Sequence, residues 1–378
     1  MKGIYLDYAA GTPIDPRVKS AMRGVFDIFA NPSSIHSEGL KAGKILNSVR
    51  ASVGRAINTK PEDIVFISSG TESCNLAILG VSGGIKKGHI IALNIEHPAV
   101  LKAVKSLEKR GFELTLVKVQ ENGIVDPEVV LKAVRPDTIL VSIMYANHEI
   151  GTIQPVAKIG RLLKQKYGSK KPLLHTDACH APGVLDIDVQ HLGVDLMSLN
   201  GSKIYGPSGV GCLYVRRGVE IEPIIVGGSQ ERGLRAGTPN LALIVGFAKA
   251  LELISKIKKK EIDNLIELRD YTIEQILKKI PDSYLNGDPA DRLPGNINIS
   301  FKDIDGEMLM LALDKKGIQV SVGSACTASS NEPSHILKAI NQKHGNLRIT
   351  LGNKTTKQEI DTLLRILPKL VSQQRERA

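Results

Sequence analysis

The sequence predicts an α/β fold, with a large domain built on a mostly parallel sheet and a smaller α+β domain. In the first two-thirds of the chain, short β-rich runs alternate with amphipathic helical runs, a rhythm typical of parallel sheets covered by helices. The rhythm changes near Gly246, where a long charged segment with helical periodicity begins. We therefore expect a large domain over residues 14–255 and a small domain built from residues 1–13 and 256–378.

The strands of the large domain are predicted from short apolar runs bounded by turn residues, and its helices from amphipathic periodicity. The predicted strands span residues 64–68, 90–95, 138–144, 173–176 and 196–199. The predicted helices span residues 72–79, 98–109 and 156–167. Because the strand runs are apolar throughout, we expect the sheet to be buried on both faces.

In the small domain the same criteria predict one long helix over residues 246–279, with a break near Lys260. Strands are expected at residues 296–301, 317–322 and 347–350, and helices at residues 334–340 and 357–373. Residues 323–332 are small or polar, which predicts a flexible loop.

The composition argues against several classes of protein. Of the 378 residues, 42% are hydrophobic and 24% are charged, which is ordinary for a soluble globular protein. No apolar run approaches the roughly 18 residues that span a bilayer, and the N-terminus lacks the features of a secretory signal. We therefore expect a cytoplasmic protein without membrane contact. The net charge of +11 has no accompanying aromatic-rich basic motif, so we interpret it as a solvated basic surface rather than a nucleic-acid site.

Polar side chains follow the predicted strands, at the carboxyl edge where open α/β sheets bind ligands. They include hydroxyls, a histidine, an amide, a carboxylate and a lysine: Ser69, Thr71, His97, Asn147, Asp177, Asn200, Ser202 and Lys203. No metal-ligand cluster is among them, and we expect no metal site. The set suits an anionic aromatic cofactor that is bound covalently through an amine.

Asp177 and Lys203 narrow the choice of cofactor. A carboxylate that ends a buried strand is costly unless it is paired, and a protonated pyridine nitrogen would be such a partner. A lysine held between glycine-containing turns at a strand end suits a Schiff base. Taken singly, Asp177 is also explained by a helix cap or an ion pair, and Lys203 by a surface position. Their combination favours pyridoxal phosphate.

Three further positions have two readings each. The helix start at residues 69–72 suits phosphate binding, but its S-x-x-E pattern is also a capping box. His97 could stack on a pyridine ring and move protons, or it could cap the helix that follows. Arg348 could clamp a carboxylate through two parallel hydrogen bonds, or it could form a surface ion pair.

The four cysteines are far apart in the sequence, with neither a disulfide framework nor zinc spacing. We expect reduced thiols, with Cys74, Cys179 and Cys212 as packing residues. Cys326 differs, because it lies in the predicted loop of small and polar residues. Such a loop suits a thiol that collects sulfur at one site and delivers it at another.

These residues together resemble the cysteine desulfurases of the aminotransferase class V superfamily, fold type I of the pyridoxal-phosphate enzymes. The resemblance covers nearly the whole chain and rests on the motifs NPSSIH, SSGTESCNLAI, EHPAV, ANHEIGTIQP, HTDACH, KIYGPSGVG, RAGTPN and GSACTAS. The longer cysteine loop resembles that of the group that serves general iron–sulfur assembly. The resemblance implies a desulfurase that converts L-cysteine and an acceptor thiol to L-alanine and a persulfide on Cys326.

The resemblance also implies roles for individual residues. Lys203, Cys326 and His97 would be catalytic. The implied cofactor-binding residues are Gly70, Thr71, His97, Asn147, Asp177, His180, Asn200, Ser202, Lys203 and Thr238. The implied substrate-binding residues are Asn31, Asn147 and Arg348. Thr238 would reach the phosphate of a neighbouring subunit, which implies a homodimer, and the sulfur acceptor would be an iron–sulfur scaffold or a tRNA-thiolation protein.

Three positions depart from the family pattern. His180 replaces a glutamine, Ser202 a histidine and His148 the second asparagine of Asn-Asn-Glu. None of them removes a group that the chemistry requires. Two kinds of alternative remain: another class V reaction, such as selenocysteine lyase or aminotransferase, and a non-catalytic sulfur-assembly scaffold. The thiol of Cys326 argues against an aminotransferase, and the pair Lys203 and Asp177 argues against a scaffold.

Overall fold

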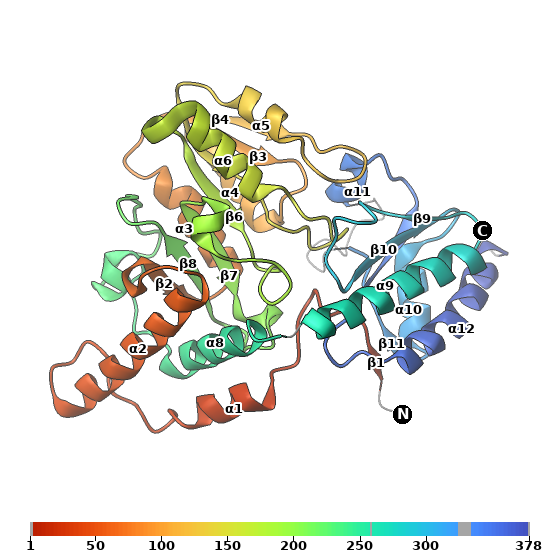
Figure 1. The fold of residues 1–378 in the computed structure, drawn as a ribbon, viewed down its shortest axis with the longest axis horizontal. Helices are drawn as coiled ribbons and strands as arrows, with labels where there is room; N and C mark the ends of the chain where they lie inside the picture. Colours follow the sequence, from red (N-terminus) through yellow and green to blue (C-terminus); the bar gives the residue numbers. More distant parts are fainter. Residues whose placement is uncertain (1–2, 258, 324–333, 377–378) are drawn as a thin grey trace.

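A seven-stranded sheet forms the centre of the larger part of the molecule (Figure 1). The computed structural model describes residues 3–257, 259–323 and 334–376. Strand order is β2-β8-β7-β6-β5-β3-β4. The five strands β3 to β7 run parallel, and β8 is antiparallel to both of its neighbours. The bounds are β2 Ile64–Ile67, β3 His89–Leu93, β4 Glu113–Val117, β5 Thr138–Ser142, β6 Leu173–Asp177, β7 Leu196–Asn200 and β8 Gly211–Val215. The predicted mostly parallel α/β sheet is thus confirmed.

Helices bury both faces of this sheet, because successive residues of each strand point to opposite sides. In β2, Phe66 packs into one hydrophobic cluster and Val65 into another. The first cluster includes side chains of α2, α6 and α8, and the second includes those of α3 and α4. The helices of this part are α1 Pro16–Arg23, α2 Ser37–Ala56, α3 Gly70–Val81, α4 Pro98–Glu108, α5 Pro127–Ala133, α6 Val156–Tyr167, α7 Val189–Leu192 and α8 Leu241–Ile254.

The smaller part has its own antiparallel sheet, in the order β12-β10-β9, and its own hydrophobic cluster. Its elements are α9 Lys259–Lys279, β9 Ser283–Leu285, β10 Asn296–Phe301, α10 Gly306–Asp314, β11 Ile318–Gln319, α11 His335–Ala339, β12 Gly345–Thr350 and α12 Lys357–Arg375. The N-terminal strand β1, Ile4–Tyr5, joins this part because it pairs in parallel with β11. This pairing is consistent with the predicted small domain of residues 1–13 and 256–378. The domain boundaries themselves stay a proposal.

Two predicted elements differ from the structure. The predicted strand at residues 317–322 is ordered as β11 over only two residues, because its partner β1 is itself two residues long. The predicted long helix begins earlier, at Leu241, where the side chain of Asn240 accepts a hydrogen bond from Leu243 N. It then ends at Ile254, and a separate helix starts at Lys259.

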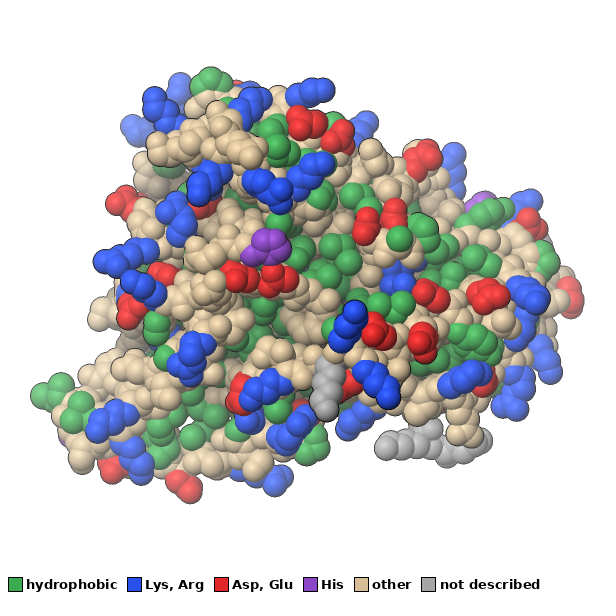
Figure 2. Space-filling model, viewed as in Figure 1, with side chains coloured by type: hydrophobic (Ala, Val, Ile, Leu, Met, Phe, Trp, Pro, Cys, Tyr) green, Lys and Arg blue, Asp and Glu red, His purple; other side chains and the backbone are tan. Residues whose placement is uncertain are grey.

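The surface combines dispersed charge with apolar side chains at one end. In Figure 2, Lys and Arg side chains are spread over the visible face with acidic side chains among them. Hydrophobic side chains gather at the end where α2 begins. Phe29 and Ile35 precede α2 in the chain, and their exposed fractions are 86% and 91%. Within residues 3–257, 259–323 and 334–376, none of the helices has the length and hydropathy needed to cross a bilayer.

Candidate active site

The ends of β6 and β7 bring Asp177 and Lys203 to the same edge of the large sheet. The two strands are parallel neighbours, with Asp177 opposite Ser198. A 3₁₀ turn, Gly201–Lys203, follows β7 directly, and the side chain of Asn200 caps it by accepting from Ser202 N at 3.3 Å. Lys203 therefore leaves the sheet one strand away from the carboxylate, as predicted from the sequence.

Asp177 keeps its negative charge in this position. Its Oδ1 accepts a hydrogen bond from Cys179 N at 3.0 Å. Burial works to raise the pKa of Asp177, but the nearby His97 ring and the hydrogen bonds from Cys179 outweigh it, so the pKa lies below its ordinary value. A charged carboxylate here would hold a proton on a facing ring nitrogen.

Lys203 reaches from the sheet edge to the N-terminal segment. Its Nζ donates to the carbonyl oxygens of Ala9 at 2.8 Å and Ala10 at 2.6 Å. Burial disfavours the ammonium form and lowers the pKa of Lys203. A lowered pKa increases the share of neutral amine, which is the nucleophilic form.

The start of α3 packs tightly against this edge. Ser69 caps the helix by accepting from Glu72 N at 3.2 Å, but Glu72 Oε2 accepts from Ser68 N rather than from Ser69 N, so the helix cap is present without the reciprocal bond of a capping box. Phosphate binding stays a prediction. A Cβ on Gly70 would lie 2.7 Å from Cys179 Sγ, so only glycine lets the helix start approach the end of β6. Thr71 follows at the exposed first turn, and its position suits an anion.

Three histidine rings face one another above the strand ends. The centroids of His97 and His148 are 4.9 Å apart in an edge-to-face arrangement, and those of His148 and His180 are 6.3 Å apart and stacked. His148 is 5% exposed, and neither of its ring nitrogens has a hydrogen-bond partner among the described residues. A buried imidazole without partners indicates a place where a ligand binds.

All three rings are neutral at physiological pH. Burial lowers the pKa of His97, sets that of His148 well below its ordinary value, and lowers the pKa of His180 to about 3. His97 Nδ1 accepts from Ala99 N at 3.0 Å, which caps α4 and leaves the proton on Nε2. His97 therefore caps the helix and still presents an N–H to the site.

Of the two residues predicted to bind the substrate carboxylate, the Asn147 amide is hydrogen-bonded within the protein, whereas Arg348 keeps a donor that no described residue uses. The amide of Asn147 is fully buried: Nδ2 donates to Ile95 O, and Oδ1 accepts from the backbone of the next turn. The ring of His148, the next residue, takes the position facing His97 instead. Arg348 Nη1 donates to His148 O at 3.3 Å, and its Nε lacks a partner within the described part of the chain. His148 was not predicted as a lining residue, because the directions of adjacent side chains in a turn cannot be deduced from the sequence.

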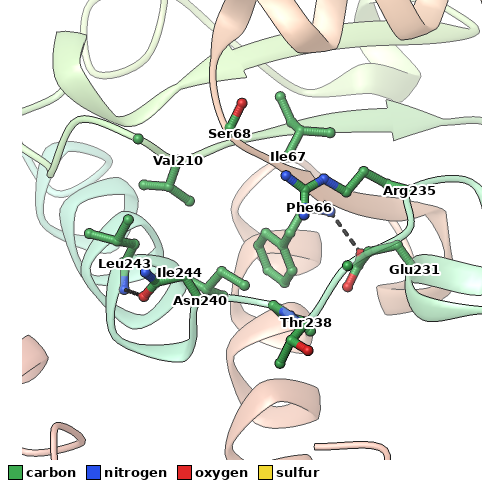
Figure 3. Close-up of a pocket in the computed structure, with 13 residues that line it drawn as sticks. Phe66, Ile67, Ser68, Val210, Glu231, Arg235, Thr238, Asn240, Leu243 and Ile244 are labelled. Atoms are coloured by element: carbon green, nitrogen blue, oxygen red, sulfur yellow. Dashed lines mark hydrogen bonds between the residues drawn. The ribbon is translucent and has the colours of Figure 1, made fainter. Parts of the chain in front are cut away.

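Thr238 and the two residues that follow Asn31 line cavities whose linings do not include Lys203 or Asp177. Thr238 is exposed and lines a cavity of about 140 Å³ with Ser68, Arg235 and Glu231 (Figure 3). Pro32 and Ser33, which follow Asn31, line an adjoining cavity of about 610 Å³ that also includes Glu231. In one chain, Thr238 and the residues next to Asn31 therefore border a region on the α2 side of the sheet.

The predicted sulfur carrier Cys326 lies outside the described residues. Cys74, Cys179 and Cys212 are buried free thiols, as expected for packing residues. Burial raises the pKa of each well above its ordinary value, so they are poor nucleophiles.

The described residues fit pyridoxal phosphate. The amine of Lys203 suits its aldehyde, the charged Asp177 its protonated nitrogen, and the start of α3 its phosphate. The ring nitrogens of His148 and Nε of Arg348 have no hydrogen-bond partner among residues 3–257, 259–323 and 334–376, so they could bond to a bound ligand.

Comparison with known proteins points to a family of the same kind. Residues 4–363 match the family described as aminotransferase class-V. The chain is 47% identical to the cysteine desulfurase IscS of Dictyoglomus turgidum, over 98% of this chain and 95% of the relative. It is 44% identical to the cysteine desulfurase IscS 1 of Archaeoglobus fulgidus, over 98% and 97%. The chain belongs to the cysteine desulfurases of the class V aminotransferase family.

Solved structures of related proteins resemble this structure over nearly the whole chain. A NifS-like protein aligns with a TM-score of 0.91 and 34% identity, covering 98% of this chain and 99% of its own. The SspA protein, solved in complex with cysteine, aligns with a TM-score of 0.81 and 34% identity, covering 93% and 100%. A cysteine desulfurase of Thermococcus onnurineus, at 23% identity and a TM-score of 0.87, shares the fold. This desulfurase therefore has the predicted fold type I architecture.

Proposed function

We propose that the protein is a pyridoxal-phosphate-dependent cysteine desulfurase that supplies sulfur for iron–sulfur assembly. L-cysteine and the thiol of Cys326 give L-alanine and a persulfide on Cys326, so one sulfur atom moves and all atoms balance. The main observation that supports this proposal is that Lys203, Asp177 and the start of α3 lie at one edge of the sheet, in a chain of this family.

The chain's own residues prepare this site for an amino-acid substrate. When bound, pyridoxal phosphate serves as an electron sink for the substrate amino acid. Asp177, whose pKa is lowered, would hold a proton on the cofactor's ring nitrogen, and Lys203, whose pKa is lowered by burial, would supply the amine for its aldehyde. His97, neutral and protonated on Nε2, presents an N–H donor to the site.

Arg348 is the residue we assign to the substrate carboxylate. Its side chain is 3% exposed, and its Nε donates to none of the residues that the structure describes. A planar guanidinium can bind a carboxylate through two parallel hydrogen bonds, which fixes the orientation of an amino acid. In this proposal Asn31 is a substrate contact, and His180, Asn200, Ser202 and Thr71 are cofactor contacts. The amide of Asn147 is already hydrogen-bonded within the protein, so Asn147 would act by fixing the turn that presents His148.

A second copy of the chain is part of the proposal. The exposed side chains Phe26, Phe29, Ile35 and Leu40 form an apolar end on the α2 side, and such patches favour association. The region that holds Asn31 and Thr238 borders the same side. In a homodimer, Thr238 would contact the partner's phosphate site. The persulfide acceptor would be an iron–sulfur scaffold or a tRNA-thiolation protein.

Visible absorbance and alanine release test the proposal. The purified protein mixed with pyridoxal phosphate should turn yellow and keep the colour through gel filtration, and Lys203→Ala should lose it. L-cysteine should then yield L-alanine and a mass increase of one sulfur on the peptide that carries Cys326. Lys41→Ala, an exposed lysine beside Glu38, is the matched control. A colourless wild type, or persulfide formation that survives Cys326→Ser, would refute the proposal, and faster turnover of selenocysteine would favour the lyase alternative.

A further inference from the structure

Two backbone carbonyls of the N-terminal segment bind the amine of Lys203. Nζ donates to Ala9 O at 2.8 Å and to Ala10 O at 2.6 Å. Within the described part of the chain, neither carbonyl accepts a backbone N–H, so both are available to the amine. We call these two oxygens the acceptor pair. They follow β1, which pairs with β11 of the smaller part, whereas Lys203 follows β7 of the large sheet.

Thr350 fixes the acceptor pair to the small sheet. Ala9 N donates to Thr350 Oγ1 at 2.9 Å, and Thr350 is 4% exposed at the end of β12. Asp7 and Thr350 also form a parallel bridge. Thr350 stands two residues after Arg348, so the two side chains leave the same face of the strand, and Arg348 pairs with Asp7. The segment that carries the acceptor pair is therefore bound to the strand that carries Arg348.

Thr12 fixes the other side of the acceptor pair to the turn that holds the lysine. Its N and its Oγ1 both donate to Ser202 O at 3.0 Å, and its Oγ1 accepts from Tyr205 N at 2.7 Å. Ser202 and Tyr205 stand just before and just after Lys203 in the chain. Direct hydrogen bonds on both sides of the lysine thus set its distance from the acceptor pair.

Neutral acceptors suit an amine that must change its bonding. A carboxylate would favour a permanent ammonium ion, because a charge-assisted hydrogen bond is roughly twice as strong as a neutral one. A carbonyl accepts from an ammonium and from a neutral amine alike. In the proposed reaction the substrate amine replaces Lys203 on the aldehyde carbon of the cofactor: one C=N bond breaks, one forms, and the two hydrogens of the substrate amine pass to Nζ. The freed N–H groups then need acceptors, since the side chain is partly buried.

We propose that the acceptor pair holds the amine of Lys203 whenever this amine is not bonded to the cofactor. Thr350 and Thr12 are then positioning residues, because the hydroxyl of each fixes the segment that carries the acceptor pair. The inference rests on the proposed function, since it takes Lys203 as the cofactor lysine. It adds a defined place for the lysine while the substrate occupies the cofactor.

Trace acetylation of the full-length, cofactor-free protein measures how freely the amine of Lys203 reacts, with peptide mass as the readout. Thr350→Val keeps the shape of the side chain but loses the hydroxyl, so Lys203 should be acetylated about threefold faster, the scale of one weakened hydrogen bond. Thr350→Ser keeps the hydroxyl and should restore the wild-type rate. Thr12→Val should act in the same direction from the other side. Thr362→Val, which loses a hydroxyl that donates to Gln358 O on α12, is the matched control and should leave the rate unchanged.

L-alanine tests the same contact in the cofactor-loaded enzyme, because it displaces the lysine but carries no sulfur to release. Its apparent Kd, measured from the visible absorbance, should rise about threefold in Thr350→Val. Propionate, which has a carboxylate but no amine, should compete with L-alanine with unchanged affinity. This comparison separates the effect of the acceptor pair from any change at Arg348.

Unchanged acetylation of Lys203 in both Thr350→Val and Thr12→Val, or equal acceleration in Thr362→Val, would overturn the inference. A Thr350→Ser variant that reacts as fast as Thr350→Val would do the same, and so would a loss of propionate affinity equal to the loss of L-alanine affinity. A wild-type protein that stays colourless with pyridoxal phosphate would instead defeat the proposed function, while the acetylation rates of the cofactor-free chain would not depend on it.

Discussion

Arg348 Nη2 and Asp7 Oδ1 lie 2.9 Å apart and form an ion pair that joins the edge of the small sheet to the N-terminal segment. The guanidinium is 3% exposed and the carboxylate 19%. Asp7 thus neutralises and orients the residue that we assign to the substrate carboxylate. This partner was not predicted from the sequence, although Asp7 stands within the YLDYAAGTP segment.

Asp7→Asn should lower the free energy of unfolding by about 2–3 kcal/mol, because it leaves a buried guanidinium without its counter-ion. Urea unfolding of the cofactor-free protein measures the change. Asp15→Asn is the matched control, since Asp15 pairs with Arg17, whose side chain is 66% exposed. The control should leave the unfolding midpoint almost unchanged. Equal shifts in the two variants would contradict a buried pair.

Gly70→Ala should weaken cofactor binding, because the new methyl group would lie 2.7 Å from Cys179 Sγ and push α3 away from the sheet edge. The double variant Gly70→Ala with Cys179→Ala removes the clash and should recover most of the affinity. Titration of the visible absorbance with pyridoxal phosphate measures both. Gly11→Ala, where a Cβ meets nothing within 4 Å, is the control. A double variant no better than the single one would count against this packing explanation.

His180→Gln should reduce the loss of stability on acidification. Burial lowers the pKa of His180 to about 3 in the folded protein. Between pH 6.5 and pH 3, His180 is therefore protonated in the unfolded chain and neutral in the folded chain. Stability that is present at pH 7 is therefore lost as pH falls, by about 2 kcal/mol at pH 5 from this one residue. Urea unfolding at pH 7 and pH 5 should show that the variant loses less than wild type.

His191→Gln is the control for this pH dependence, because His191 is 62% exposed and contacts Asp186. Its unfolding should respond to pH as the wild type does. If His180→Gln retained the full loss of stability, the ring would not be buried and neutral as described.

Glu231→Gln should destabilise the protein by about 3 kcal/mol, because it breaks a buried two-point pair. Glu231 accepts from Arg50 Nη1 and Nη2, each at 2.6 Å, and from Phe66 N at 2.8 Å. Thermal unfolding of the variant tests this, with Glu113→Gln as control. Glu113 pairs with Arg135 at the surface, and its loss should have little effect.

The large sheet was predictable because its parallel strands are buried on both faces. Residues 138–142 and 196–200 are fully or largely buried and read as short apolar runs in the sequence. The strand β8 was missed, although residues 211–215 are equally buried, because it follows directly on the glycine-rich turns after Lys203. The pairing of β1 with β11 could not be predicted either, since each strand has two residues and no periodicity.

The site was predictable as far as it follows strand ends. Asp177 and Lys203 stand at the carboxyl ends of β6 and β7, which is a topological rule and needs no coordinates. The sequence could not show which of Asn147, His148 and Glu149 points into the site, because the direction of a side chain in a turn depends on packing. The contacts of Asp7 and Thr350 join distant parts of the chain and leave no local pattern.

Lys203 Nζ donates hydrogen bonds to the carbonyls of Ala9 and Ala10. These two residues follow the N-terminal strand β1, which pairs with β11 at residues 318–319. During synthesis these first residues leave the ribosome long before that partner exists. At ordinary elongation rates the interval is roughly 15 to 60 seconds. The surroundings of Lys203, the proposed cofactor lysine, are therefore completed only near the end of translation. A truncated chain would carry Lys203 without the carbonyl contacts described above.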